Sequence, residues 1–159
     1  MITSYHQLID EIDKRLINLG FMDGEFDLDH VGYKCSSLPD YNSKKQEFLN
    51  TTQIIHEGEV RGRKVSIFKF KTPVIYKKHT ILGFEVVSPA IDEKSESYWE
   101  HVEYVVSSSL QKLVDKHLSV NWDKSALDKP LFSKVVIRFE DGLSAKFHTE
   151  TVLDEVKKF

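Results

Sequence analysis

The sequence has almost no cysteine, no excess of basic residues and no long apolar run. Cys35 is its only cysteine, which excludes an internal disulfide and a zinc site built from thiolates. The 22 basic and 25 acidic residues leave a net charge of −3, so we expect neither a nucleic-acid nor a membrane partner. No stretch reaches the roughly 18 apolar residues of a membrane span, and the N-terminus lacks the residue order of a secretory signal. We therefore expect a cytoplasmic protein, in which any metal site is built from His, Asp and Glu.

The composition is that of one globular domain, with 40% hydrophobic residues over 159 positions. Apolar residues at three- and four-residue spacing predict an N-terminal helix, and Ser4 and Gln7 have the spacing of a capping box at its start. Alternating apolar patterns further along predict two runs of β-α-β-β-β. The predicted segments are the helix at about 2–19, module one at about 26–88, module two at about 99–150, and a C-terminal helix at about 151–158.

Three short matches indicate that the two modules are a duplication. Asp29-His30-Val31-Gly32-Tyr33 matches Glu100-His101-Val102-Glu103-Tyr104, and Lys64-Val65-Ser66-Ile67 matches Lys134-Val135-Val136-Ile137. The two offsets differ by one residue, and each match falls on the equivalent predicted strand. A looser match joins Phe84-Glu85 to Phe147-His148, if the last hairpin of module two is shortened. A duplicated module explains the three matches together.

Duplicated modules that pack about a pseudo-twofold axis bring equivalent strand faces to one cleft. His30 is then expected to face His101, and Glu85 to face His148. Imidazole nitrogens and carboxylate oxygens are ligands for zinc, nickel, manganese, cobalt and iron(II), among which the sequence does not choose. We therefore predict a divalent metal site at these four residues. The alternatives are hydrogen-bonded core histidines and a salt bridge from Glu85 to Lys34.

This arrangement of His and Glu resembles the vicinal oxygen chelate superfamily, which includes glyoxalase I, extradiol dioxygenases and antibiotic-resistance binding proteins. More narrowly, four stretches resemble the YecM family: Asp29–Cys35, Gly62–Phe70, Trp99–Glu103 and Lys146–His148. The resemblance implies an α+β fold in which two β-α-β-β-β modules form an open barrel, with a helix added at each end of the chain. It also implies a metal cleft at His30, Glu85 and His101. The superfamily's usual final glutamate is Lys146 in this chain, so His148 is the expected substitute.

Three functions remain open. The first is a metal-dependent isomerase, lyase or dioxygenase acting on a small oxygen-bearing metabolite, with the metal as Lewis acid and Glu103 as general base or ligand-orienting group. The side chains expected to contact its substrate are Lys34, Lys146, Tyr33 and Tyr104. The second is a non-catalytic small-molecule binding or sequestering protein, whose ligand binding would not respond to chelators. The third is an interaction module with structural histidines. A homodimer is compatible with the sequence, which does not specify one.

Overall fold

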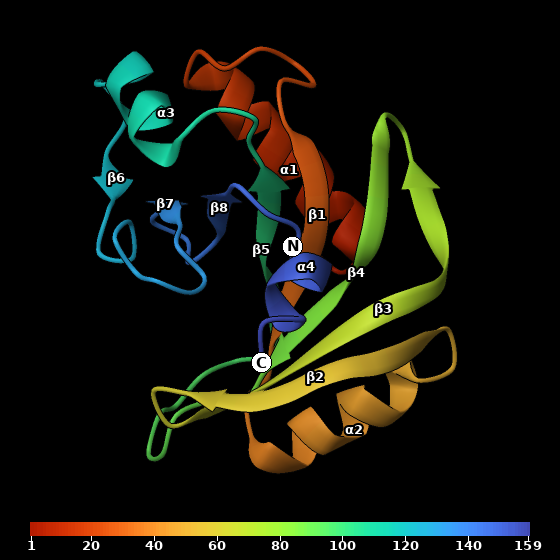
Figure 1. The fold of residues 1–159 in the computed structure, drawn as a ribbon. Coiled ribbons are helices and arrows are strands. Elements are labelled where there is room, and N and C mark those ends of the chain that lie inside the picture. Colours follow the sequence, from red (N-terminus) through yellow and green to blue (C-terminus); the bar gives the residue numbers. More distant parts are fainter.

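The computed structural model describes residues 1–159 and contains four helices and one mixed sheet of eight strands (Figure 1). The elements are α1 (Tyr5–Asn18), β1 (Asp27–Lys34), α2 (Leu38–Phe48), β2 (Thr52–Val60), β3 (Arg63–Tyr76), β4 (His79–Val87), β5 (Tyr98–Val105), α3 (Leu110–Lys116), β6 (Trp122–Asp123), β7 (Val135–Arg138), β8 (Ser144–His148) and α4 (Val152–Val156). None of these helices is long and apolar enough to cross a membrane.

The strand order is symmetric about the centre of the sheet. It runs β2-β3-β4-β1-β5-β8-β7-β6, so β1 and β5 are antiparallel neighbours at the centre. Each of them pairs in parallel with the last strand of its own module, β4 or β8. The remaining two strands of each module continue outward in the same order. The predicted α+β fold of two β-α-β-β-β modules is therefore confirmed, and the sheet that was expected as an open barrel is not closed.

The modules differ in length as the sequence indicated. In module one, the residues around Thr72 to Lys78 prolong the β3–β4 hairpin, whose outer end pairs Tyr76 with His79. In module two, the region 119–131, which shows no clear sequence pattern, contains only the two-residue strand β6. A tight turn at Arg61-Gly62 joins β2 to β3, and both of its residues have positive φ.

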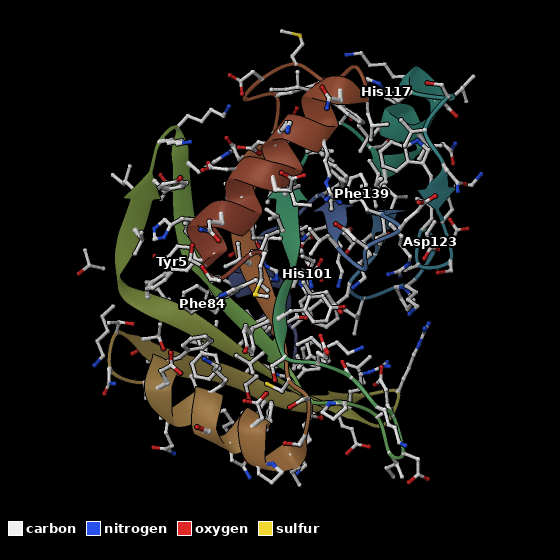
Figure 2. All side chains as sticks on the ribbon, turned by 180° about the vertical axis from the view of Figure 1, so that it is seen from behind. Tyr5, Phe84, His101, His117, Asp123 and Phe139 are labelled. Atoms are coloured by element: carbon white, nitrogen blue, oxygen red, sulfur yellow. The ribbon has the colours of Figure 1, made fainter.

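Helix α1 begins at the predicted cap. The hydroxyl of Ser4 accepts a hydrogen bond from the Gln7 amide at 3.2 Å, and the Gln7 side chain accepts one from the Thr3 amide at 2.8 Å. The carboxamide thus returns to the residue before the cap, so the capping box closes one residue earlier than the usual form. The apolar stripe of the helix, buried against the sheet, consists of Leu8, Ile9, Ile12 and Leu16. Figure 2 shows α1 lying across the back of the sheet, with Tyr5 near Phe84 of β4.

The two faces of the sheet have different chemistry. Helices α1 and α2 cover the face behind the plane of Figure 1, and between them lies a core that includes Val31, Phe84, Val102 and Phe147. Successive strand residues point to opposite faces, so the residues between these apolar ones point the other way. There the central strands carry histidines, glutamates and lysines, and α4 lies on that side (Figure 1).

Candidate metal centre

Four side chains from three central strands meet on the polar face of the sheet. His30 comes from β1, Glu85 from β4, and His101 and Glu103 from β5. One ligand atom of each lies within 4.8 Å of the ligand atoms of the other three. The structure therefore brings together His30, His101 and Glu85 as predicted, and it adds Glu103. We call these four residues the four-residue cluster.

The distances in the four-residue cluster fit a shared ion better than they fit hydrogen bonds. Nε2 of His30 lies 3.6 Å from the nearer oxygens of both Glu85 and Glu103. Nε2 of His101 lies 3.7 Å from Glu85 and 3.5 Å from Glu103. Two ligands of a tetrahedral ion with bonds of about 2.1 Å stand about 3.4 Å apart.

The Nε2 atoms of the two histidines in the four-residue cluster are buried and have no hydrogen-bond partner. Nε2 of His30 and Nε2 of His101 are both unsatisfied, although each side chain is only 1% exposed. A buried polar atom without a partner is costly, and native proteins rarely keep one without a reason. Two such nitrogens and two carboxylates converging on one place form a donor set that suits a divalent ion.

Gly32 creates the space that the His101 ring occupies. It pairs with His101 across β1 and β5, and a Cβ atom built on it would overlap the imidazole of His101. The overlap is with a buried ring held in a sheet, which cannot move aside easily. Glycine at position 32 is therefore required by the placement of His101 and not by a special backbone angle.

Two β-bulges place a carboxylate behind each histidine. In the β1–β5 pairing the register skips Asp29 on one strand and Glu100 on the other, so each is the extra residue of a bulge. A bulge redirects a side chain, and each acid turns toward the histidine that follows it. Oδ2 of Asp29 lies 2.7 Å from Nδ1 of His30, and Oε1 of Glu100 lies 3.2 Å from Nδ1 of His101. Each carboxylate accepts a hydrogen bond from the Nδ1–H group, which leaves Nε2 to face the cluster.

The sequence reasoning missed the role of these two acids. Its signal was present, because the repeated motif has an acidic residue immediately before each histidine. Strand alternation alone would put neighbouring residues on opposite faces, and only the bulges bring them together. Asp29 also accepts a hydrogen bond from the Val152 amide at 2.9 Å, which ties the start of α4 to His30.

The electrostatics of the four-residue cluster keep its carboxylates ionised. Burial alone would raise the pKa of Glu85, but His30, His101 and Lys146 outweigh it and lower the pKa to about 2. Burial opposes ionisation of Glu103 as well, and the positive charge of His30 holds its pKa well below the ordinary value. Burial lowers the pKa of His30, but Glu103, Asp29 and Glu85 outweigh burial and raise it. For His101, burial and then Lys146 lower the pKa.

His148 does not meet Glu85, contrary to the sequence prediction. In the parallel pair β5–β8, His148 stands opposite Val105, whereas Lys146 stands opposite Glu103. The loose match of Phe84-Glu85 to Phe147-His148 was therefore out of register by two residues. His148 lies beside the cluster, with Nε2 3.4 Å from Glu103 and 3.5 Å from Asp29.

The residues predicted to contact a substrate divide into two groups. Lys34 and Lys146 line a cavity that opens over the four-residue cluster. Lys34 forms an ion pair with Glu93 at 2.6 Å, so the alternative of a salt bridge from Lys34 to Glu85 is not observed.

Tyr33 and Tyr104 do not line the cavity, which corrects the sequence prediction. Strand alternation points both to the helix-covered face of the sheet. There the ring of Tyr33 packs against Trp99, with 5.0 Å between centroids, and the hydroxyl of Tyr104 donates to Asp13 at 2.9 Å. Both tyrosines are core residues.

The cavity has a volume of about 620 Å³ and draws its walls from both modules. Glu85 and Glu103 of the cluster belong to its lining, together with charged side chains of β3, β7 and β8. The C-terminal segment closes part of it, through Val152, Glu155 and Phe159. Its volume is within the range of sites that bind small molecules.

Comparison with solved structures identifies the fold. The structural-genomics protein EC4020 superposes with a TM-score of 0.76 at 19% identity, over 96% of this chain and 87% of that protein. Methylmalonyl-CoA epimerase of Streptomyces coelicolor, in complex with 2-nitronate-propionyl-CoA, gives a TM-score of 0.55 at 10% identity, over 78% of this chain and 96% of that one. A selenomethionine methylmalonyl-CoA epimerase gives a TM-score of 0.53 at 15% identity, over 80% of this chain and 97% of that one.

These epimerases are members of the vicinal oxygen chelate superfamily, so the resemblance in fold expected from the sequence is confirmed. The identities are too low to transfer an activity, and no curated protein sequence matches the chain. A family model does match, over residues 1–151 of the 159. The chain therefore belongs to the YecM family and has the fold of the vicinal oxygen chelate superfamily.

Proposed function

We propose that the protein binds one divalent metal ion through His30, Glu85, His101 and Glu103, and that it acts on a small oxygen-bearing metabolite in the cavity above them. The observation that carries this proposal is the pair of buried Nε2 atoms without partners, facing two ionised carboxylates. A bound ion would supply Lewis-acid chemistry, which stabilises negative charge on a substrate oxygen. Zinc, nickel, manganese, cobalt and iron(II) all accept this donor set.

The residues around the cluster are arranged to keep its geometry rigid. Asp29 and Glu100 orient the two imidazoles through Nδ1, and both carboxylates lie on the central strands. Such outer partners typically raise metal affinity by about 10- to 100-fold. Rigid placement of this kind favours a site that holds an ion tightly and orients a substrate.

Glu103 has two oxygens with different surroundings. Oε1 faces the histidine Nε2 atoms, and Oε2 lies 3.4 Å from Nε2 of His148. In the proposed site, Oε1 would bind the metal ion, and Oε2 would be the general base that takes a proton from the substrate. Glu103 would thus combine the general-base role expected for it with the fourth ligand position that was expected for His148.

The test of the proposed function is elemental analysis of protein purified without chelator or affinity-tag metal. The wild type is expected to carry nearly one ion per chain, and the double variant His30→Ala/His101→Ala is expected to carry none. The double variant His6→Ala/His56→Ala removes two histidines outside the four-residue cluster and is expected to retain the ion. A wild type that holds no metal, and takes up none of the five candidate ions, would overturn the proposal.

Chelator treatment separates catalysis at a metal from simple sequestration. In the proposed function, removal of the ion abolishes turnover and weakens binding of an oxygen-chelating ligand. Tight ligand binding that persists without metal would instead favour a sequestering protein with the same fold.

A further inference from the structure

The C-terminal segment, residues 152–159, forms part of the wall of the cavity and lies beyond the residues 1–151 that match the family model. It begins with α4, which lies in front of the polar face of the sheet (Figure 1). Three of its side chains line the cavity, and one of them, Phe159, is 66% exposed and so lies at the mouth. The segment therefore narrows the way from solvent to the four-residue cluster.

The inner end of the segment is fixed. The Val152 amide donates to Oδ2 of Asp29 at 2.9 Å, and the Val152 side chain is buried. The hydroxyl of Thr151 caps α4 by accepting a hydrogen bond from the Asp154 amide at 3.2 Å. A movement of the segment would therefore turn about Thr151 and Val152.

Phe159 holds the outer end of the segment between the two modules. Its ring stacks on Phe132 of module two, with 5.3 Å between centroids and 17° between the planes. It also contacts His56 on β2 of module one, with 5.2 Å between centroids. Aromatic pairs contribute modestly to stability, so these contacts close the mouth without locking it.

Glu155 opposes closure of the mouth. Its side chain is buried, and its carboxylate accepts one hydrogen bond, from the Phe132 amide at 3.2 Å. Lys158, one turn further on, pairs with Glu150 instead, at 2.7 Å. A carboxylate that is buried without a cation loses its hydration and gains little in return. Movement of the segment away from the cavity would return this charge to water.

The strands that line the cavity are held more firmly than the segment. They are joined in one sheet by backbone hydrogen bonds, whereas α4 buries only Val152 and Glu155. Segments with few buried apolar contacts open at the lowest free energy. The C-terminal segment is therefore a part of the wall that can move while the sheet stays in place.

We propose that residues 152–159 are a gate, closed by Phe159 against Phe132 and His56 and opposed by the buried charge of Glu155. In its closed position the gate leaves a passage for small ligands only, and larger ligands enter when it turns outward. This inference concerns entry to the cavity. It goes beyond the proposed function and applies with or without a bound ion.

The test measures entry with a thiol placed inside the cavity of the full-length protein as purified. Val136 lines the cavity, is 3% exposed and stands opposite Lys146, so Val136→Cys introduces the thiol at depth. The native Cys35 lies in the core, and burial raises its pKa to about 12, so it gives little background. The reagents, N-ethylmaleimide and N-(1-pyrenyl)maleimide, are neutral and differ in size. The size ratio, defined as the labelling rate of the large reagent over that of the small one, cancels the reactivity of the thiol.

Three variants, each combined with Val136→Cys, assign the size ratio to the gate. Phe159→Ala is expected to raise the ratio about tenfold, because both aromatic contacts are lost. Glu155→Gln is expected to lower it at least about threefold, because the amide keeps the hydrogen bond and removes the buried charge. Lys157→Ala shortens an exposed side chain of the same segment and is the matched control, with no change expected.

Opposite shifts of the size ratio in Phe159→Ala and Glu155→Gln would support the gate. The inference is overturned if Phe159→Ala leaves the ratio at its starting value, or if Glu155→Gln raises it. Ser108→Cys places a thiol at an exposed position outside the cavity. Equal shifts of the ratio at that thiol would also overturn the inference, because they would not report entry to the cavity.

Discussion

The two modules share a strand order and differ at the two positions that decide the site. Module one has Gly32 on its central strand and Glu85 on the strand beside it. Module two has Glu103 and Lys146 at the equivalent positions. Each module thus contributes one histidine and one carboxylate, but the carboxylates come from different strands. The comparison teaches that a duplication can keep the number of side chains that meet in the cluster while the positions of those side chains change.

The difference between the modules also creates the asymmetry of the cavity. Gly32 leaves room for the His101 ring, whereas Glu103 stands opposite His30 and closes the corresponding space. The position on β8 that is equivalent to Glu85 on β4 carries the positive charge of Lys146. A symmetric backbone therefore supports a site with a negative side and a positive side.

The largest loss of metal binding is expected from Gly32→Ala, which fills the space that the His101 ring occupies beside Gly32. The new methyl group overlaps the His101 imidazole, so the ring must leave the cluster. We expect metal content to fall close to zero and the free energy of unfolding to fall by about 1–3 kcal/mol, as for other overpacked sites. Elemental analysis and urea unfolding measure the two effects.

Gly58→Ala is the matched control for Gly32→Ala. Gly58 is an exposed residue of β2, and the atoms nearest to its added methyl group belong to the side chain of His56. Its metal content should equal that of the wild type. Normal metal content in Gly32→Ala would show that His101 is not a ligand in the observed position.

The next effect tests the equivalence of positions 85 and 146 directly. Glu103→Gly gives module two the glycine that module one has at position 32 and removes one proposed ligand. Loss of a carboxylate that only orients a ligand costs roughly 10- to 100-fold in metal affinity, so the loss of Glu103 should cost more. Adding Lys146→Glu gives module two the second residue of module one as well. The double variant is expected to recover most of the affinity, measured by competition with a chelator. If it binds metal no better than Glu103→Gly, the proposed equivalence is wrong.

A smaller effect is expected from the acids that precede the histidines. Asp29→Asn and Glu100→Gln should each weaken metal binding by about 10- to 100-fold while leaving the ligands in place. The Asp29 variant should be the more severe, because its contact with histidine is shorter and because it also accepts the Val152 amide. Equal affinities in the wild type and both variants would mean that the imidazoles are oriented by packing alone.

The repeat made much of the fold predictable from the sequence. His30 and His101 lie in the same repeated motif, and a second repeated motif has nearly the same offset. The two offsets together predicted the order of strands in each module. Glu85 could be predicted as a cluster member because an acid within an apolar strand needs a partner. These inferences required only local pattern and the symmetry of a duplication.

The rest of the site depended on features that the pattern does not encode. Strict alternation along a strand predicts that neighbouring side chains point to opposite faces of the sheet. Two bulges break this alternation and turn Asp29 and Glu100 toward the histidines that follow them. The match of Phe84-Glu85 to Phe147-His148 allows for a shortened hairpin but places the equivalent of Glu85 two residues too late, at His148. The pairing of β5 with β8 identifies Lys146 as that equivalent, at the position where the resemblance to the superfamily implied a glutamate.

The smallest effect is expected on stability, from the ion pairs that Glu93 makes with residues of module one. Glu93, between the modules, accepts hydrogen bonds from Lys34, Ala90 and Arg63, and these contacts lower its pKa to about 2. A carboxyl whose pKa is lowered on folding stabilises the protein above its ordinary pKa of 4.5. That contribution should disappear as the pH falls from about 4.5 to about 2.

Glu93→Gln measures this contribution. At pH 7 it should lower the free energy of unfolding by about 1 kcal/mol, and the difference from the wild type should shrink steadily below pH 4.5. Metal content should not change, because Glu93 lies outside the four-residue cluster. A difference in stability that is the same at pH 7 and pH 3 would contradict the ionic contribution.

The most direct test of the metal centre is anomalous diffraction from crystals of the wild-type protein soaked in zinc. We expect one anomalous peak, with Nε2 of His30, Nε2 of His101 and carboxylate oxygens of Glu85 and Glu103 at about 2.0–2.2 Å from it. An ion bound by His148 and Asp29 instead, or no peak between the four residues in zinc-saturated crystals, would contradict the assignment of the site.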